Sequence, residues 1–390
     1  MTICDYDACT GCGMCSNICG KEAISMIEDK HGFFHPKIDK AKCIECGLCS
    51  TKCPANNRYN TESMQKVYAC WTKNKKLRKN STSGGIFSTI AKEIINKNGI
   101  VIGCAWDEDF STHHICVDCE DALYKLRGSK YVQSKTKDIY KKTKQLLDSG
   151  KKVLFSGTPC QVHALKLFLG KEYEGLFTID LVCHGVPPYQ LFKKHIDEIS
   201  KGKTDNIAHV FLRYKKPSWL FGSVRVEYKD GSRYMQPTVK DAYFNLFNFN
   251  YSLRMSCHKC SYTNMQRTGD ITLCDFWGFY PRSMRLFRYD KGVSAAIINS
   301  PKGEELFEKI KSGIKYDNDS IERVTVGNKS LYQPFQAPND HDKFWFDVTN
   351  GMSISELNKK YVKKPYKIPP LLKLRVLKSQ IKWIIDGVRI

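Results

Sequence analysis

The sequence predicts a small α+β module followed by a larger α/β domain with a mostly parallel sheet and an antiparallel insertion. First, two cysteine runs with identical spacing fill the first 58 residues or so. Second, from Lys66 onward short apolar segments alternate with segments of helical periodicity. Third, two short segments of strand character flank a turn at Asp230-Gly231 within the larger domain. We therefore expect domains at 1–58 and 59–320, and a C-terminal extension at 321–390.

The two runs, C-x2-C-x2-C-x3-C, have the spacing of a bacterial two-cluster ferredoxin. In that arrangement the fourth thiolate of each run binds the cluster of the other run. One [4Fe-4S] cluster is therefore expected on Cys9, Cys12, Cys15 and Cys53, and a second on Cys43, Cys46, Cys49 and Cys19. Disulfides would need an oxidising compartment, and zinc sites prefer two pairs of Cys or His, so we favour a ferredoxin-like iron-sulfur module.

The composition is that of a globular protein, with 42% hydrophobic and 26% charged residues among 390. Eighteen cysteines, with no signal-peptide pattern ahead of Cys4, predict a cytoplasmic location and metal ligation. The formal net charge of +22 stays basic after each cubane adds about two negative charges. It favours an acidic redox partner, a phosphorylated or carboxylated substrate, or a membrane surface. No nucleic-acid-binding motif is visible, so we expect no nucleic-acid partner.

The elements of the second domain follow a polar linker at 56–65. Strands are expected at 67–71, 100–106, 152–156, 177–182 and 293–298. Helices are expected at 84–96, 138–147, 159–169, 188–199, 242–254 and 302–311. The insertion is expected to pair 224–228 with 233–235.

Four later cysteines could form a third metal site. Cys160 and Cys183 each follow an expected buried strand, and Cys257 and Cys260 form a close pair. Since the carboxyl ends of parallel strands meet in one crevice, the four thiols can converge on a third cubane there. Zinc would fit four cysteines equally well, and isolated buried cysteines are a further alternative.

Two groups of small residues predict a phosphate-bearing cofactor. Ser83, Gly84 and Gly85 precede the expected helix, where free amides can bind an anion. The second group adds two cations to a glycine: Arg127, Gly128, Ser129, Lys130 and Tyr131. The alternative for the first group is a helix cap with a tight turn.

Polar residues near the late cysteines have two interpretations. Arg267, Asp270 and Asp275 could orient a cofactor ring or relay protons, or could form buried ion pairs that tie a loop in place. His184 could donate a proton or could be structural.

The C-terminal stretch 371–390 has apolar residues at helical spacing and basic residues between them. Such a helix can lie on anionic lipid, which would make the protein membrane-peripheral, or dock on its own domain or on a second subunit. We favour the docked helix. Its charges are too frequent for a membrane-spanning segment.

The chain from Cys9 to Ile310 resembles the family of coenzyme F420 hydrogenase/dehydrogenase beta subunits. Besides the cysteine runs, the resemblance rests on SGGIFS at 83–88, RGSKYVQS at 127–134, GTPCQ at 157–161, VCHG at 182–185, and CHKC at 257–260 followed by GDITLCDFWG at 269–278.

The resemblance implies a flavin-binding α/β domain and an iron-sulfur flavoprotein oxidoreductase. It implies FAD, with FMN as the alternative, bound by Ser83, Gly84, Gly85, Ser129, Lys130 and Tyr131. It also implies a third [4Fe-4S] cluster on Cys160, Cys183, Cys257 and Cys260, while Cys274 stands where relatives commonly carry glycine. Electrons would come from reduced ferredoxin or a similar donor and leave to an organic hydride acceptor. The alternative is a non-catalytic electron-transfer subunit of a larger redox complex.

Overall fold

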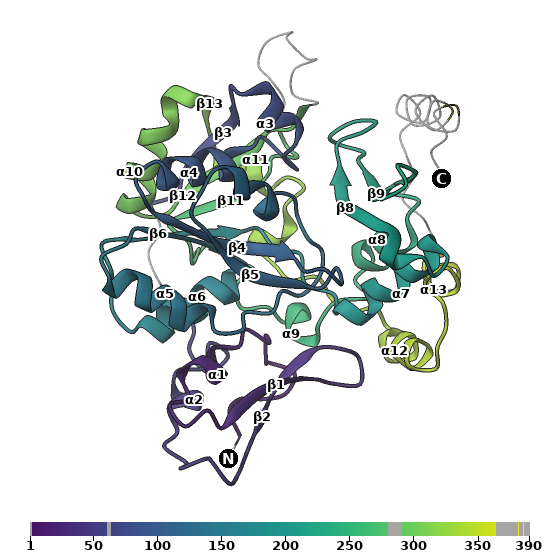
Figure 1. The fold of residues 1–390 in the computed structure, drawn as a ribbon, viewed down its shortest axis with the longest axis horizontal. Helices are drawn as coiled ribbons and strands as arrows, with labels where there is room; N and C mark the ends of the chain where they lie inside the picture. The colour runs from purple at the N-terminus through teal and green to yellow at the C-terminus, as the bar shows by residue number, and fades with distance from the viewer. Residues whose placement is uncertain (1, 61–63, 280–290, 364–380, 382–384, 386–390) are drawn as a thin grey trace.

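The computed structural model describes residues 2–60, 64–279, 291–363, 381 and 385. The helix expected over 371–390 therefore lies, apart from two residues, outside the described part of the chain. Figure 1 shows the N-terminal module beneath a large sheet, and a second lobe with its own strands beside that sheet. None of the helices in the described ranges has the length and hydropathy to cross a bilayer.

The N-terminal module contains two short helices and one hairpin. Its elements are α1 (Met14–Ile18), β1 (Ile24–Glu28), β2 (Phe34–Ile38) and α2 (Leu48–Thr51). The hairpin is antiparallel, with Ile24 opposite Ile38. Gly13 and Gly47 precede the two helices with φ of 71° and 74°, a left-handed conformation that glycine adopts without strain. The glycines of the cysteine runs therefore allow the tight turns that start both helices.

The large sheet has eight strands in the order β13-β3-β12-β11-β7-β6-β4-β5. These are β3 (Lys66–Thr72), β4 (Ile100–Trp106), β5 (Thr112–Val117), β6 (Val153–Gly157), β7 (Leu176–Leu181), β11 (Ile271–Asp275), β12 (Ser294–Ile298) and β13 (Ile314–Asp319). Neighbours β4, β6, β7 and β11 are parallel, and β3 runs the same way because it is antiparallel to β12. The prediction of a mostly parallel sheet is confirmed. The expected strands are all present, whereas β5, β11 and β13 were not foreseen.

Helices cover both faces of this sheet. The helices after the linker are α3 (Lys75–Lys79), α4 (Ile86–Ile95), α5 (Ile139–Asp148), α6 (Pro159–Leu169), α7 (Tyr189–Ser200), α8 (Ala242–Asn248), α9 (Met255–His258), α10 (Pro301–Ile310), α11 (Ile321–Thr325), α12 (His341–Thr349) and α13 (Ile354–Tyr361). Side chains of α4 and α10 pack in one core cluster, and those of α5 and α6 in another. The helix expected at 242–254 ends at Asn248, because Asn250 has a positive φ of 70° and interrupts it.

The insertion forms an antiparallel sheet of three strands, β8 (Ile207–Tyr214), β9 (Ser223–Tyr228) and β10 (Arg233–Pro237). The expected hairpin is present, with Arg233 opposite Glu227, and β8 was not foreseen. This sheet shares a core with α7, α8, α12 and α13, built on Phe192, Tyr243 and Phe344. Residues 341–361 of the expected C-terminal extension therefore belong to this lobe (Figure 1).

Candidate functional site

The first three thiols of the first run and the last thiol of the second run lie together. Cys9, Cys12, Cys15 and Cys53 are all at most 9% exposed. Burial, with the neighbouring thiols of Cys12, Cys9 and Cys53 adding to it, raises the pKa of Cys15. The structure thus groups the four residues expected around one cluster. A fifth thiol, Cys4, which sequence reasoning missed, hydrogen-bonds to Cys9 and lowers the pKa of that thiol.

The other expected group lies nearer to solvent. Burial raises the pKa of Cys49, and the charges of Cys19 and Cys46 add to the rise. Cys46 is exposed, and Cys19 and Cys43 are partly buried. This group is therefore the more accessible of the two in the module.

Four thiols from distant parts of the second domain also converge. Cys160 lies in the first turn of α6, Cys183 follows β7, and α9 carries Cys257. Burial, followed by the proximity of Cys257, Cys160 and Cys260, raises the pKa of Cys183 well above its ordinary value. Within the described ranges, no three His, Cys, Asp or Glu side chains lie close enough to share a single metal ion.

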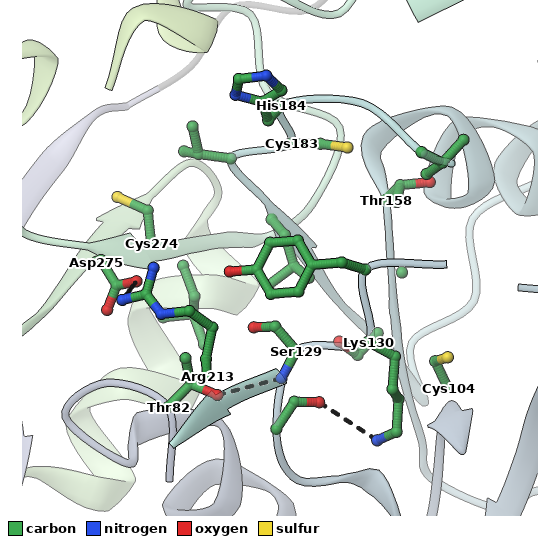
Figure 2. A pocket seen from close by; sticks show the side chains of 18 of the residues that line it. Thr82, Cys104, Ser129, Lys130, Thr158, Cys183, His184, Arg213, Cys274 and Asp275 are labelled. Atoms are coloured by element: carbon green, nitrogen blue, oxygen red, sulfur yellow. Dashed lines mark hydrogen bonds and ion pairs between the residues drawn. The ribbon is translucent and has the colours of Figure 1, made fainter. Parts of the chain in front are cut away.

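This donor set fits an iron-sulfur cluster. Backbone amides point at its sulfurs and partly oppose the effect of burial on the pKa, as Gly185 does at Cys183 and Val186 at Cys257. Amide donors of this kind stabilise thiolates and cluster sulfur. Cys274 is not part of the set, because the charges that act on the pKa of its thiol come from Asp275, Arg267 and Asp180 and not from the four late cysteines. In Figure 2 the Cys183 side chain points away from Cys274.

The late cysteine set, which is Cys160, Cys183, Cys257 and Cys260, lies beside the inner group of the module, which is Cys9, Cys12, Cys15 and Cys53. The charge of a Cys160 thiolate adds to the burial that raises the pKa of Cys12 to about 12. Tyr140 of α5 is fully buried there and donates a hydrogen bond to the carbonyl oxygen of Cys12 at 3.0 Å. The packing of α1 on α5 and α6 brings the two sets together.

A cavity of about 500 Å³ opens at the carboxyl ends of β6, β7 and β11. Cys160 and Cys183 line one part of it. The predicted cofactor residues that line it are Ser83, Gly85, Arg127, Gly128, Ser129, Lys130 and Tyr131. Two loops distant in sequence meet here, because the amide of Ser129 donates to Thr82 Oγ1 at 3.1 Å (Figure 2).

Two of the predicted residues have other contacts than expected. Gly84 does not line the cavity, and a Cβ there would lie 2.4 Å from the carbonyl oxygen of Cys70. Gly84 therefore lets this loop pack closely on β3. The Lys130 ammonium donates to the carbonyl oxygens of Lys125 and Arg127, both at 3.0 Å, so it braces its own loop. Burial lowers its pKa to about 8.

Sequence reasoning missed a cation on β8. Arg213 lines the cavity and lies 3.6 Å from Asp275 Oδ2 (Figure 2). Its guanidinium lies 5.0 Å from the centre of the Trp277 ring. Its buried Nη2 has no hydrogen-bond partner within the described residues. Lys215, two residues on, donates to the carbonyl oxygen of Ser83 at 2.9 Å and so holds the glycine loop. No local motif marks either cation, since both come from the insertion.

The polar residues after the cysteine pair divide between structure and site. Arg267 lies 3.2 Å from the fully buried Asp180, which also accepts from Thr268. Asp270 accepts from the amide and hydroxyl of Thr178, both at 2.7 Å. Both therefore tie buried strands together, as the structural interpretation holds. Of the three residues, Asp275 alone lines the cavity.

His184 is held in a fixed place. It stacks on Phe335 with ring centroids 3.9 Å apart, and its Nε2 is 2.8 Å from Asn250 Oδ1. Burial lowers its pKa to about 4. The ring is therefore neutral near pH 7, which agrees with a structural role.

Comparison with known proteins gives three family matches. The model of the coenzyme F420 hydrogenase/dehydrogenase beta subunit matches in two parts, the N-terminal part at residues 67–141 and the C-terminal part at 150–323. A 4Fe-4S dicluster domain matches residues 8–57.

Individual relatives are distant. The chain is 22% identical over 353 residues to a subunit of the F(420)H(2) dehydrogenase of Methanosarcina mazei, covering 84% of this chain and 92% of that protein. It is 33% identical over 54 residues to an uncharacterized ferredoxin of Methanocaldococcus jannaschii, covering 14% of this chain and 69% of the ferredoxin. A chain in the xenon-derivatized F420-reducing [NiFe] hydrogenase complex from Methanosarcina barkeri matches with a TM-score of 0.48 and 16% identity, over 80% of this chain and 98% of that one.

Proposed function

Because the chain belongs to the family of coenzyme F420 hydrogenase/dehydrogenase beta subunits, we propose that it is an iron-sulfur flavoprotein oxidoreductase. It takes electrons from reduced ferredoxin or a similar donor and delivers them to an organic hydride acceptor. One observation carries the proposal: Cys160 and Cys183 of the late cysteine set line the same cavity as the predicted cofactor loops.

The residues present fit three clusters and a flavin. Two [4Fe-4S] clusters would be held by the eight module cysteines, and a third by Cys160, Cys183, Cys257 and Cys260. When bound, the clusters supply single-electron carriage and FAD, or FMN, supplies the conversion of two electrons into a hydride. The outer group with the exposed Cys46 would face the donor, since it is the most accessible of the three sets.

The chain's own groups define how a flavin would be held. Gly85 precedes the ten-residue helix α4, so free amides there can bind a phosphate. Arg127 adds a cation, and its Nε is fixed by Ser88 Oγ at 3.2 Å. Among the described residues, Arg213 Nη2 forms no hydrogen bond and lies 3.6 Å from Asp275 Oδ2, so it can still offer a charged donor to a carbonyl or anionic atom.

The test is anaerobic reconstitution of the full chain, with extraction of the bound cofactor and assay of iron and sulfide. We expect about twelve iron atoms per chain and a flavin that bleaches on addition of a reduced donor. The variant Cys183→Ser should lose about a third of the iron and should slow the bleaching. Full iron loading with no bound flavin under any reconstitution would overturn the proposal.

A second candidate is an electron-transfer subunit whose partner holds the active site. It is supported by the name of the relative from Methanosarcina mazei, which is one subunit of a dehydrogenase. Turnover of small hydride acceptors by the isolated chain would exclude this candidate. Oxidation of the donor only after a second subunit is added would support it.

A further inference from the structure

Arg254 lies buried between the N-terminal module and the second domain. It is 2% exposed and immediately precedes α9. Its Nε donates to the carbonyl oxygen of Cys9 at 2.6 Å, and Nη2 donates to that of Phe34 at 2.9 Å. Nη1 donates to Gln133 Oε1 at 3.3 Å. One side chain from the second domain therefore binds the module at a residue of the inner cysteine group.

The guanidinium also lies close to thiols of the inner group and of the late cysteine set. At Cys9, a hydrogen bond from Cys4 is the largest influence lowering the pKa, and the charge of Arg254 adds to it. At Cys257, burial raises the pKa to about 12 and the charge of Arg254 opposes that rise. Arg254 opposes the effect of burial on the pKa of Cys160 in the same way. The geometry joins the two sets as well: Arg254 Nε donates to the carbonyl oxygen of Cys9, and the carbonyl oxygen of Arg254 accepts from the amide of Cys257 at 2.9 Å. Arg254 therefore contacts the module and the late cysteine set together.

Among the described residues, no carboxylate forms a direct ion pair with this cation; Asp29 is connected to it through the His35 ring, whose Nε2 lies 3.5 Å from Asp29 Oδ2. Every hydrogen bond that the structure gives Arg254 ends on a carbonyl oxygen, an amide oxygen or the His35 ring, and none of the ion pairs between described residues includes it. Arg267, the other deeply buried arginine near the cysteines, has Asp180 at 3.2 Å. A buried charge without a counter-charge is strongly destabilising. Two sets of four thiolates holding iron would supply the missing negative charge.

We propose that Arg254 is the shared counter-ion of two clusters, one on the inner group of the module and one on the late cysteine set. Its fixed charge favours the reduced state of both clusters. The inference rests on the proposed function. Each transfer moves one electron from the cluster that is oxidised to the cluster that is reduced. No proton moves, because the guanidinium stays charged. Arg254 is thus a positioning residue that places positive charge along the electron path.

The test is an anaerobic redox titration of the reconstituted full chain, in which electron paramagnetic resonance follows the clusters. Arg254→Gln removes the charge but keeps hydrogen-bond donors, and Arg254→Lys keeps the charge but loses the planar fork. Lys259→Gln is the matched control, because Lys259 lies between two late cysteines but is exposed and its charge is screened by solvent.

At a fixed potential, Arg254→Gln should lower the ratio of reduced to oxidised cluster on the order of tenfold at both inner sites. Arg254→Lys and Lys259→Gln should stay close to wild type. Equal shifts in the lysine and glutamine variants, or none in the glutamine variant, would overturn the inference. If the glutamine variant fails to retain iron, a lysine variant that departs from wild type overturns it, and one that matches wild type supports it. A wild-type chain without iron or flavin would instead refute the proposed function.

Discussion

At the scale of single residues, the buried charged side chains differ in how completely they are hydrogen-bonded. Asp180 receives hydrogen bonds from Thr268 and Thr272 as well as its ion pair with Arg267. Such a satisfied network stabilises the sheet and leaves nothing for a ligand. Arg213 differs, because it lines the cavity and one of its buried nitrogens has no hydrogen-bond partner in the described chain. A cation that both lines the cavity and keeps a buried nitrogen without a hydrogen bond is thus the better candidate for a binding residue here.

On the proposed function, Arg213→Gln should weaken the binding of the proposed flavin about tenfold or more, since a hydrogen bond from a charged donor contributes about 1.5–3 kcal/mol. The dissociation constant of FAD, measured by fluorescence on the flavin-free protein, checks this. Arg225→Gln is the control, because Arg225 lies on the neighbouring strand β9 and its partner there is Glu227. Equal affinities of the Arg213 variant and wild type would contradict the assignment.

Because His114 is buried, we expect the folded protein to lose stability in acid. Burial lowers its pKa to about 4, and its ring nitrogens lie 2.9 Å from Ser134 Oγ and 3.2 Å from the carbonyl oxygen of Ser156. The folded state therefore holds the ring neutral, while the unfolded state takes up a proton below about pH 6.5. This contribution to stability is complete above about pH 6.5 and is lost as the pH falls toward about 4, by up to about 3 kcal/mol.

Thermal unfolding midpoints at about pH 7 and about pH 5, on either side of the ordinary histidine pKa, test this prediction. His114→Gln should show a smaller drop between the two pH values than wild type. His209→Gln, which changes an exposed histidine of β8, should show the wild-type drop. If all three proteins lose the same stability, His114 is not the responsible group.

At the scale of elements, the start of α4 is placed by close packing. Gly84 lies where a Cβ would meet the carbonyl oxygen of Cys70 in β3 at 2.4 Å and the amide nitrogen of Ser294 in β12 at 2.9 Å. Lys215 holds the same loop from the other side through the carbonyl oxygen of Ser83. The position of the helix N-terminus at the cavity thus depends on two strands and on the insertion.

Gly84→Ala should destabilise the protein by about 1–3 kcal/mol, because the added methyl group has to displace backbone. It should also weaken the proposed flavin binding, because it moves the amides at the start of α4. Gly313→Ala is the matched control, since the nearest atom to a Cβ there lies at 3.8 Å. The free energy of unfolding in denaturant and the affinity for FAD, measured on both variants, test this prediction. Identical values for Gly84→Ala and Gly313→Ala would refute the packing argument.

At the scale of the whole molecule, the N-terminal module has little core of its own. Its buried apolar cluster consists of Ile3, Ile24 and three cysteines, Cys15, Cys49 and Cys53. The second domain has several larger clusters on both faces of its sheet. The module's stability should therefore depend on metal far more than that of the sheet.

Anaerobic removal of iron by a chelator should unfold the module and leave the eight-stranded sheet intact. Amide hydrogen exchange is expected to rise over residues 2–57 and to stay slow in β6 and β7, which are central strands. Unchanged protection of β1 and β2 after complete iron removal would show that the module folds without metal.

Local sequence patterns predict much of this architecture. The cysteine spacing predicts the ferredoxin-like module, and apolar segments bounded by turn residues predict the parallel strands β4, β6 and β7. The strands that were missed lie mostly at sheet edges, as β5 and β13 do, or follow a polar loop, as β11 does. Edge strands are partly exposed, so their side chains lack a continuous apolar run. The pattern alone could not show that β12 runs antiparallel to β11.

By itself, the sequence predicted candidate residues for binding metal and phosphate, because such sites depend on short spacings and on glycines that adopt special backbone conformations. Tertiary structure alone decided which polar groups belong to the cavity. Arg213 comes from an inserted sheet, Arg254 bridges two domains, and Arg267 pairs with Asp180 from another strand. The physical reason is that a charge acquires its role from the partners that surround it, and those partners are distant in the chain.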